Sequence, residues 1–145
     1  MNIKIKKLTD TAQIPTRGSE YAAGYDLYAD IKESVIIPPQ TVVKIPTGIA
    51  TEIPHGFFGA IFPRSGIATK RLLNLINDIP VIDEDYRGEW ILPIFNAGNE
   101  DQIIEPGERI AQFILLPYQI LNIIEVNELS NTTRGENGFG SSGTK

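Results

Sequence analysis

Proline and glycine recur along the whole chain and divide it into short runs rich in Val, Ile, Phe and Tyr. Ten prolines and thirteen glycines are spread over 145 residues, so few segments are long enough for a helix. Short β-branched and aromatic runs between turn residues are typical of strands. The pattern predicts an all-β domain of the sandwich, jelly-roll or barrel type. The predicted strands are residues 2–7, 25–29, 34–38, 41–50, 57–62, 80–83, 89–96, 102–105, 108–117 and 122–127, and only residues 66–72 are predicted as a short helix.

The length of the chain is that of one domain. No linker is evident before residue 130, where the sequence becomes polar and then rich in glycine. We therefore expect a β domain over residues 1–129 and a flexible C-terminal arm over residues 130–145.

Charge and residue usage exclude several classes of function. The formal net charge of −5 argues against non-specific electrostatic binding to nucleic acid, so no direct nucleic-acid binding is expected. Because the chain has no cysteine and only one histidine, it has no disulfide, zinc–thiolate site or multi-histidine metal centre. Any metal site must use oxygen ligands, which favours Mg²⁺. The one histidine, His55, follows Pro54 and precedes Gly56, and we expect it to be a turn residue.

The sequence shows no basic and apolar leader and no stretch of about twenty apolar residues. Neither export nor membrane insertion is indicated. We expect a soluble intracellular protein, cytoplasmic by default.

Within the C-terminal arm, residues 134–143 combine four glycines with one arginine, one aromatic ring and two hydroxyls. Glycines let the backbone approach an anion, and Arg134, Ser141 and Ser142 can donate hydrogen bonds to phosphate oxygens. Phe139 can stack on a base. The alternative is a flexible tail without a ligand, since termini rich in Gly and Ser are commonly disordered.

Two internal segments combine glycine or another small residue with a charged side chain. Asp26 lies in Ala-Gly-Tyr-Asp-Leu, where a plain turn is the alternative. Arg64, Ser65 and Gly66 offer a cation, a hydroxyl and free amides at a predicted helix start, which suits an anion. An ordinary capped turn is the alternative there.

Residues 81–90 place four carboxylates beside a tyrosine and an arginine in one predicted hairpin. A solvated charged turn is the alternative. Strand alternation would put Asp83 and Asp85 on one face and Glu84 on the other, so one acid can act as a base while others are paired. A further segment, residues 107–113, is a charged turn that enters an apolar strand and says little by itself.

Taken in order, the segments AGYDL, PRSG, VIDEDYRG, GERIAQ and RGENGFGSSG closely resemble the five ordered motifs of the trimeric dUTPase (deoxyuridine 5'-triphosphate nucleotidohydrolase) family. The resemblance spans residues 20–143. It implies a distorted β jelly roll that assembles as a homotrimer, with three sites at the subunit boundaries. It also implies Mg²⁺-dependent hydrolysis of dUTP to dUMP and pyrophosphate, which limits uracil in DNA and supplies dUMP for dTMP synthesis.

The resemblance assigns roles in the hairpin. Asp83 matches the carboxylate that orients and deprotonates the water attacking the α-phosphorus. Tyr86 matches the ring that packs under the deoxyribose and leaves no room for a 2′-hydroxyl; a core aromatic is the alternative. Uracil would be read between Asn77 and Tyr86, by backbone groups around Val81 and by the Asn77 amide.

The remaining motifs match positions that hold the triphosphate. By resemblance, Arg64, Ser65 and Gly66 contact phosphate, and Gln112 meets the phosphate chain. Asp26 matches a carboxylate that holds water around Mg²⁺, the metal being bound chiefly by the triphosphate. In the arm, the terminal phosphates and the uracil ring would be held by Arg134, Phe139, Gly140, Ser141 and Ser142.

Two positions in the hairpin are interpreted differently. Arg87 is expected to pair with a nearby acid and fix the hairpin, with direct ligand contact as the alternative. Pro80 departs from the family, which usually has glycine there, so a backbone donor or a positive-φ turn is lost. We expect the hairpin to keep its course despite Pro80 and to recognise uracil through Asn77.

Two other functions stay open at this point. The first is that of the dCTP deaminase branch of the same fold, although the chain shows no match to the arginine and glutamate constellation of that branch after the second motif. The second is that of a nucleotide-responsive protein that binds a regulatory partner. Ammonia release from dCTP would distinguish the deaminase.

Overall fold

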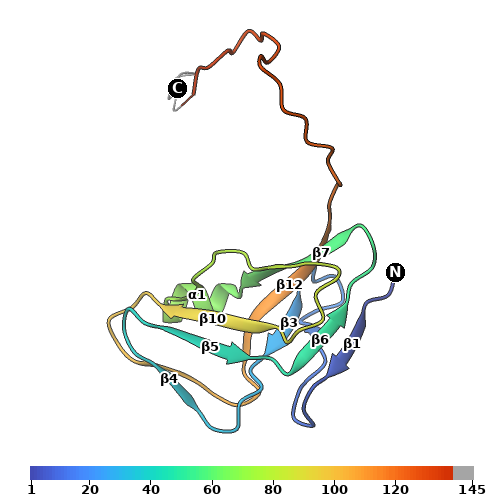
Figure 1. The fold of residues 1–145 in the computed structure, drawn as a ribbon. Coiled ribbons are helices and arrows are strands. Elements are labelled where there is room, and N and C mark those ends of the chain that lie inside the picture. Colours follow the sequence, from blue (N-terminus) through green and yellow to red (C-terminus); the bar gives the residue numbers. More distant parts are fainter. Residues whose placement is uncertain (139–145) are drawn as a thin grey trace.

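The computed structural model describes residues 1–138. In that part the chain forms twelve strands and one short helix (Figure 1). The strands before the helix are β1 (Lys4–Lys7), β2 (Thr16–Arg17), β3 (Tyr25–Tyr28), β4 (Val35–Ile37), β5 (Val42–Pro46), β6 (Ile49–Glu52) and β7 (Phe57–Pro63). The helix α1 (Ser65–Arg71) is followed by β8 (Leu73–Leu75), β9 (Val81–Ile82), β10 (Ile91–Asn96), β11 (Gln102–Ile104) and β12 (Arg109–Pro117).

All strand pairs described are antiparallel, and the largest sheet has five strands in the order β2-β3-β12-β7-β9. A three-stranded sheet has the order β5-β10-β8, and two-stranded sheets join β1 to β6 and β4 to β11. β12, the longest strand, pairs with β3 on one side and β7 on the other. The all-β prediction is therefore confirmed.

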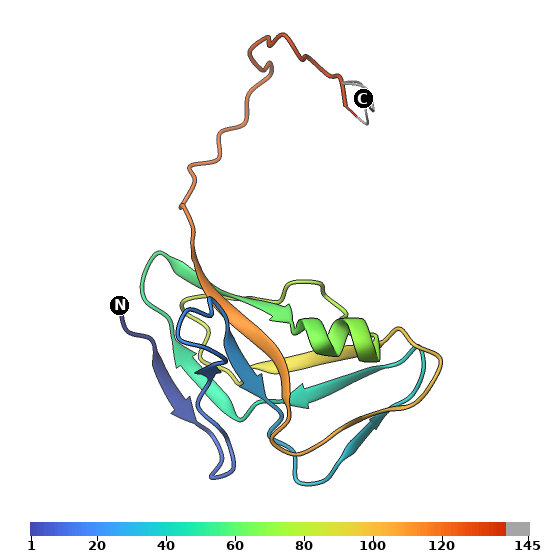
Figure 2. The same cartoon turned by 180° about the vertical axis from the view of Figure 1, so that it is seen from behind.

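The core lies between the five-stranded sheet and the three-stranded sheet, which form two layers (Figures 1 and 2). Trp90 is fully buried, and its ring meets that of Phe113 edge to face, with centroids 5.1 Å apart. Such pairs add stabilisation beyond the area they bury. Ile45 and Leu92 fill the three-stranded side of this core, and Leu27 fills the other.

The predicted strand over residues 41–50 is wrong in one respect, because it is two strands. Gly48 has a φ of +65°, which breaks the extended backbone between β5 and β6. Thr47 donates its hydroxyl to the carbonyl of Trp90 at 2.6 Å, and the Gly48 amide donates to the Glu89 carboxylate at 2.8 Å. The two-residue strand β2 and the three-residue strand β8 were not predicted from the pattern.

The predicted strand over residues 122–127 is also wrong, since no strand is formed there. Its backbone pairs with no strand among residues 1–138, and its apolar side chains are exposed; they are those of Ile123, Ile124 and Val126. The chain leaves the β body after β12, and residues 118–138 extend away from it without a helix or strand (Figures 1 and 2).

The short helix was predicted at 66–72 and is found at Ser65–Arg71. It ends because Leu72 adopts the left-handed conformation, with a φ of 54°. No helix among residues 1–138 is long and apolar enough to span a membrane.

Candidate active site

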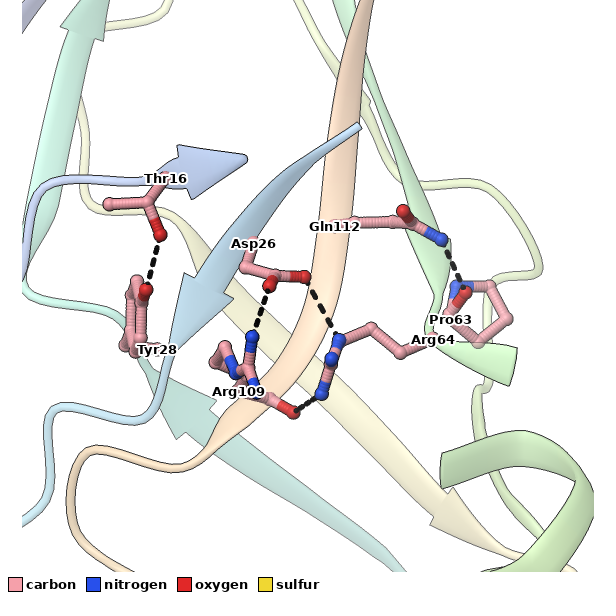
Figure 3. Close-up of polar contacts among 7 residues, drawn as sticks. All are labelled: Thr16, Asp26, Tyr28, Pro63, Arg64, Arg109 and Gln112. Atoms are coloured by element: carbon pink, nitrogen blue, oxygen red, sulfur yellow. Dashed lines mark hydrogen bonds and ion pairs between the residues drawn. The ribbon is translucent and has the colours of Figure 1, made fainter. Parts of the chain in front are cut away.

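Asp26 on β3 stands at the centre of one group of predicted site residues, and its two carboxylate oxygens bind different arginines (Figure 3). The Arg64 Nε lies 2.9 Å from Asp26 Oδ1, and the Arg109 Nη1 donates to Asp26 Oδ2 at 3.1 Å. Arg64 also donates from Nη1 to the carbonyl of Arg109 at 3.0 Å. The three side chains therefore form one network that connects β3, β12 and the residue before α1.

The electrostatics of this network favour an anion. Asp26 is only 6% exposed, whereas the arginines keep part of their surface open to water. Two positive charges against one negative charge leave a net positive charge of one. Arg109 was not singled out from the sequence, because a charged turn that enters an apolar strand has no distinctive pattern.

Gln112 lies opposite Asp26 in the register of β12 and β3. Its side-chain amide donates to the carbonyl of Pro63 at 3.3 Å (Figure 3). Gly24 lies against the same side chain, and a Cβ on Gly24 would overlap the Gln112 amide oxygen. Glycine at position 24 therefore lets the Gln112 side chain lie beside β3.

These residues line a cavity of about 290 Å³. The predicted residues in its wall are Asp26, Arg64, Ser65, Gly66 and Gln112. Ser65 and Gly66 belong to the first turn of α1, where no side chain caps the helix and no acidic residue occurs. The first amides of a helix have no acceptor within the helix, so they are available to an anion.

The hairpin residues lie elsewhere. Val81 and Asp83 line a second cavity, of about 580 Å³, which has no lining residue in common with the first. Asp83 is exposed, and no hydrogen bond or ion pair of its carboxylate is found among residues 1–138. Asn77 is exposed in the turn between β8 and β9. Within one chain, the predicted phosphate contacts therefore lie apart from Asp83, the predicted general base.

Pro80 is accommodated in this hairpin. Its carbonyl accepts a hydrogen bond from the amide of Ile61 on β7 at 3.0 Å, just before β9 pairs with β7. The residue with positive φ is Asp78, at 56°, two positions earlier. The turn therefore takes its left-handed residue at Asp78.

Tyr86 is partly exposed and donates its hydroxyl to the carbonyl of Glu89 at 3.1 Å. A Cβ on Gly88 would overlap the Tyr86 ring, coming within 2.9 Å of Cε2. The ring can lie over residue 88 only because that residue is glycine. Tyr86 is therefore a surface ring held in place, and the alternative of a core aromatic is wrong.

Glu84 was not predicted as a site residue, yet its carboxylate makes two short contacts. The amide of Gly56 donates to Oε2 at 2.7 Å, and His55 Nδ1 lies 2.8 Å from Oε1. The hydrogen bond with His55, followed by that with Gly56, lowers the pKa of Glu84 below its ordinary value. Burial and then the Glu84 carboxylate raise the pKa of Tyr118. His55 is a turn residue, as expected, and also a partner of the hairpin.

Arg87 fixes the hairpin, but not through an acid as expected. Its Nη1 donates to the carbonyls of Glu84 at 2.6 Å and Tyr86 at 3.1 Å, and more weakly to that of Thr51 at 3.4 Å. No ion pair of Arg87 occurs in the described part of the chain. The guanidinium satisfies carbonyls that the tight turn leaves without strand partners.

Arg134 lies in the extended segment after β12. It is exposed and donates from Nε to the carbonyl of Asn137 at 2.9 Å. The other predicted arm residues, Phe139, Gly140, Ser141 and Ser142, lie outside the described residues.

Comparisons with known proteins agree with this architecture. The family model for dUTPase matches residues 10–143. The chain is 41% identical over 145 residues to the deoxyuridine 5'-triphosphate nucleotidohydrolase of Hydrogenobaculum sp. (strain Y04AAS1), with both chains covered in full. It is 42% identical over 142 residues to the protein of the same name from Paramecium bursaria Chlorella virus 1, with 98% of each covered. A mutant dUTPase of Staphylococcus bacteriophage 80alpha, solved with dUpNHpp, superposes with a TM-score of 0.85 at 29% identity over 99% of each chain.

Proposed function

This chain belongs to the dUTPase family, and we propose that it hydrolyses dUTP to dUMP and pyrophosphate. The observation that carries the proposal is the cavity around Asp26, where Arg64, the first turn of α1 and Gln112 converge, with Arg109 bound to the other oxygen of Asp26. Such a set of donors suits a chain of phosphates. Hydrolysis would limit uracil in DNA and supply dUMP for dTMP synthesis.

In this proposal Arg64, Ser65, Gly66 and Gln112 bind the phosphate chain. Arg64 can reach phosphate while its Nε stays on Asp26, because a guanidinium presents five N–H donors. Gln112 can turn its amide from the Pro63 carbonyl to a phosphate oxygen, since the 3.3 Å contact is weak. The net positive charge of the network supports this role.

We also propose that Mg²⁺ accompanies the nucleotide. No group of three or more acidic or histidine ligands that could hold a metal ion occurs among residues 1–138. Asp26 already binds an arginine with each oxygen, so it fits a water of the Mg²⁺ shell better than the ion itself. When bound, Mg²⁺ would neutralise charge on the triphosphate.

Asp83 is the proposed general base. Its exposed carboxylate is free of protein partners in the described chain, so it can accept a proton from the water that attacks the α-phosphorus. Hydrolysis by an in-line water needs no covalent intermediate, which suits a chain without cysteine and with one histidine.

The hairpin would also select the nucleotide. Asn77 and the backbone around Val81 are proposed to read uracil, and Tyr86 to pack under the deoxyribose and exclude a 2′-hydroxyl. The fixed position of Tyr86 over Gly88 supports the second role, because only a held ring can reject one oxygen atom.

The chain is proposed to act as a homotrimer with sites shared between subunits. Two observations support this assembly. The phosphate contacts and Asp83 line different cavities of one chain, so a complete site needs a second copy. The run from Ile120 to Val126 also exposes several large apolar side chains to water. Exposed apolar runs of this kind mark surfaces that a partner subunit covers.

We further propose that residues 130–145 form an arm that closes over the site of a neighbouring subunit. Arg134, Ser141 and Ser142 would hold the terminal phosphates there. Phe139, next to Gly140 in the sequence, would stack on uracil. Closure of such an arm excludes water while it positions the phosphates.

The test is pyrophosphate release from dUTP, dCTP, dTTP and UTP in parallel, with Mg²⁺ and with a chelator, beside an Asp83→Asn variant. We expect release from dUTP alone, loss with the chelator, and a fall of about a hundredfold or more in the variant. Ammonia release from dCTP would indicate the deaminase instead. Nucleotide binding without release from any of the four would indicate a binding protein.

A further inference from the structure

We propose that Glu84 is a positioning residue that clamps the hairpin carrying Asp83 to the turn between β6 and β7, and so fixes the direction of the Asp83 carboxylate. The inference rests on the proposed function of Asp83 as the base. It concerns a residue that lines the same cavity as Asp83 and acts through the backbone of its neighbour.

The geometry of the clamp is bidentate. Glu84 Oε2 accepts from the Gly56 amide at 2.7 Å, and Oε1 accepts from His55 Nδ1 at 2.8 Å. Gly56 has a φ of +81°, a conformation that turns the chain sharply just before β7 begins. Because the two carboxylate oxygens bind two donors of one tight turn, they restrain the distance between residue 84 and this turn. They also restrain the rotation of the Glu84 side chain.

Asp83 needs such a restraint. Its own carboxylate has no protein partner among residues 1–138, so no contact of the side chain itself sets its direction. The next residues of the hairpin fix the backbone of Asp83. Its carbonyl accepts from the Tyr86 amide at 3.1 Å, and Arg87 holds the carbonyl of Glu84.

The turn that receives the clamp is itself anchored. The carbonyl of Gly56 accepts from the amide of Tyr118, the first residue after β12, at 3.0 Å. Glu84, Asp83 and Tyr118 line the same cavity. The clamp therefore connects the proposed base to the longest strand of the five-stranded sheet, at the point where the C-terminal segment departs.

Removal of the clamp should affect turnover more than binding. In Glu84→Ala both contacts are lost, and a displaced base is expected to lower kcat by about tenfold to a hundredfold. The KM for dUTP should stay within about twofold, because the phosphate contacts lie in the other cavity. Glu84→Gln keeps an oxygen that can accept from the Gly56 amide, so it should restore most of kcat.

The experiment measures kcat and KM for dUTP, and hydrogen exchange of the Gly56 amide, in the full-length wild type, E84A and E84Q. Glu33→Ala is the control, because Glu33 is exposed before β4 and its side chain has no hydrogen bond or ion pair among residues 1–138. The proposal expects faster exchange at Gly56 and a lower kcat in E84A only. Wild-type kcat in E84A, a raised KM with unchanged kcat, or equal losses in E33A would each overturn it.

Two further measurements keep the test decisive if E84A does not fold or the wild type is inactive. If E84A does not fold, the double variant E84Q with H55A loses the charge and the His55 contact at constant side-chain length. A severalfold lower kcat there at constant KM supports the clamp, and wild-type kcat overturns it. If the wild type releases no pyrophosphate from dUTP, the proposed function fails by itself. Gly56 exchange at the wild-type rate in E84A, or in the double variant, then overturns the clamp separately.

Discussion

Asp26 on β3 and Gln112 on β12 lie directly opposite each other in the five-stranded sheet. Directly paired residues in antiparallel strands place their side chains on the same face. On that face Asp26 binds Arg64 and Arg109, and Gln112 contacts the end of β7. One strand register thus brings three separate sequence segments to a single cavity.

Replacement of Arg109 by alanine should weaken both the fold and nucleotide binding. Asp26 is nearly buried, and the loss of one arginine leaves an oxygen without its partner. We expect a loss of about 1–2 kcal/mol in the free energy of unfolding and a raised KM for dUTP. Denaturant titration and steady-state kinetics measure the two. Arg17→Ala, on the neighbouring strand β2, is the control, because its guanidinium lies over Tyr25 and not on Asp26. Equal losses in both variants would contradict the prediction.

Gly88→Ala should reduce discrimination between dUTP and UTP. The new Cβ overlaps the Tyr86 ring, which must then move from the position where it would exclude a 2′-hydroxyl. The ratio of kcat/KM for dUTP to that for UTP is expected to fall by about tenfold or more. Tyr86→Phe keeps the ring over Gly88 and should keep the ratio. An unchanged ratio in Gly88→Ala would show that the ring does not select the sugar.

Removal of residues 130–145 should abolish efficient turnover and leave the fold intact. Residues 118–138 contribute no strand or helix, so the core loses no packing. The melting temperature is therefore expected to stay constant while pyrophosphate release falls severely. A truncated chain with full activity would refute the proposed arm, and one that unfolds would refute the proposed domain boundary.

Charge placed in the apolar run after β12 should weaken subunit assembly. Ile123 is 90% exposed in the single chain, so Ile123→Glu should not change the stability of one subunit. Where a partner subunit covers this position, burial of the charge would destabilise the assembly. We expect sedimentation to show smaller species for Ile123→Glu than for the wild type at equal concentration. Lys32→Glu, in the loop before β4, is the control. Unchanged sedimentation of Ile123→Glu would mean that this run lies outside the interface.

The contribution of Glu84 to stability should depend on pH. Its pKa in the folded chain is lowered by His55 and then by Gly56, so folding favours the charged carboxylate. The contribution is therefore complete above the ordinary pKa of 4.5 and is lost as the pH falls through the lower folded value. The melting temperature of the wild type should exceed that of Glu84→Gln at neutral pH, and the difference should shrink below pH 4.5. A constant difference across this range would contradict the assignment.

Much of the fold was accessible from the sequence because strand and turn signals are local. Alternation and β-branched runs predicted β3, β10 and β12, and the short helix predicted at residues 66–72 is found as α1. Residues 122–127 misled the same reasoning, because a β-rich run becomes a strand only where a sheet edge is available. The break at Gly48 escaped it, since one glycine inside an apolar run gives no sign of its φ.

The sequence by itself determined which residue types can act at the site and the order of the segments that carry them. It assigned no role to Arg109 in the charged turn at residues 107–113 and gave no sign that His55 and Glu84 would meet. Only the tertiary structure decided those relationships. Arg109 reaches Asp26 through the pairing of β12 with β3, and Glu84 reaches Gly56 because β9 pairs with β7. Contacts between residues distant in sequence depend on strand register and on the close packing of the core, and no local pattern encodes either.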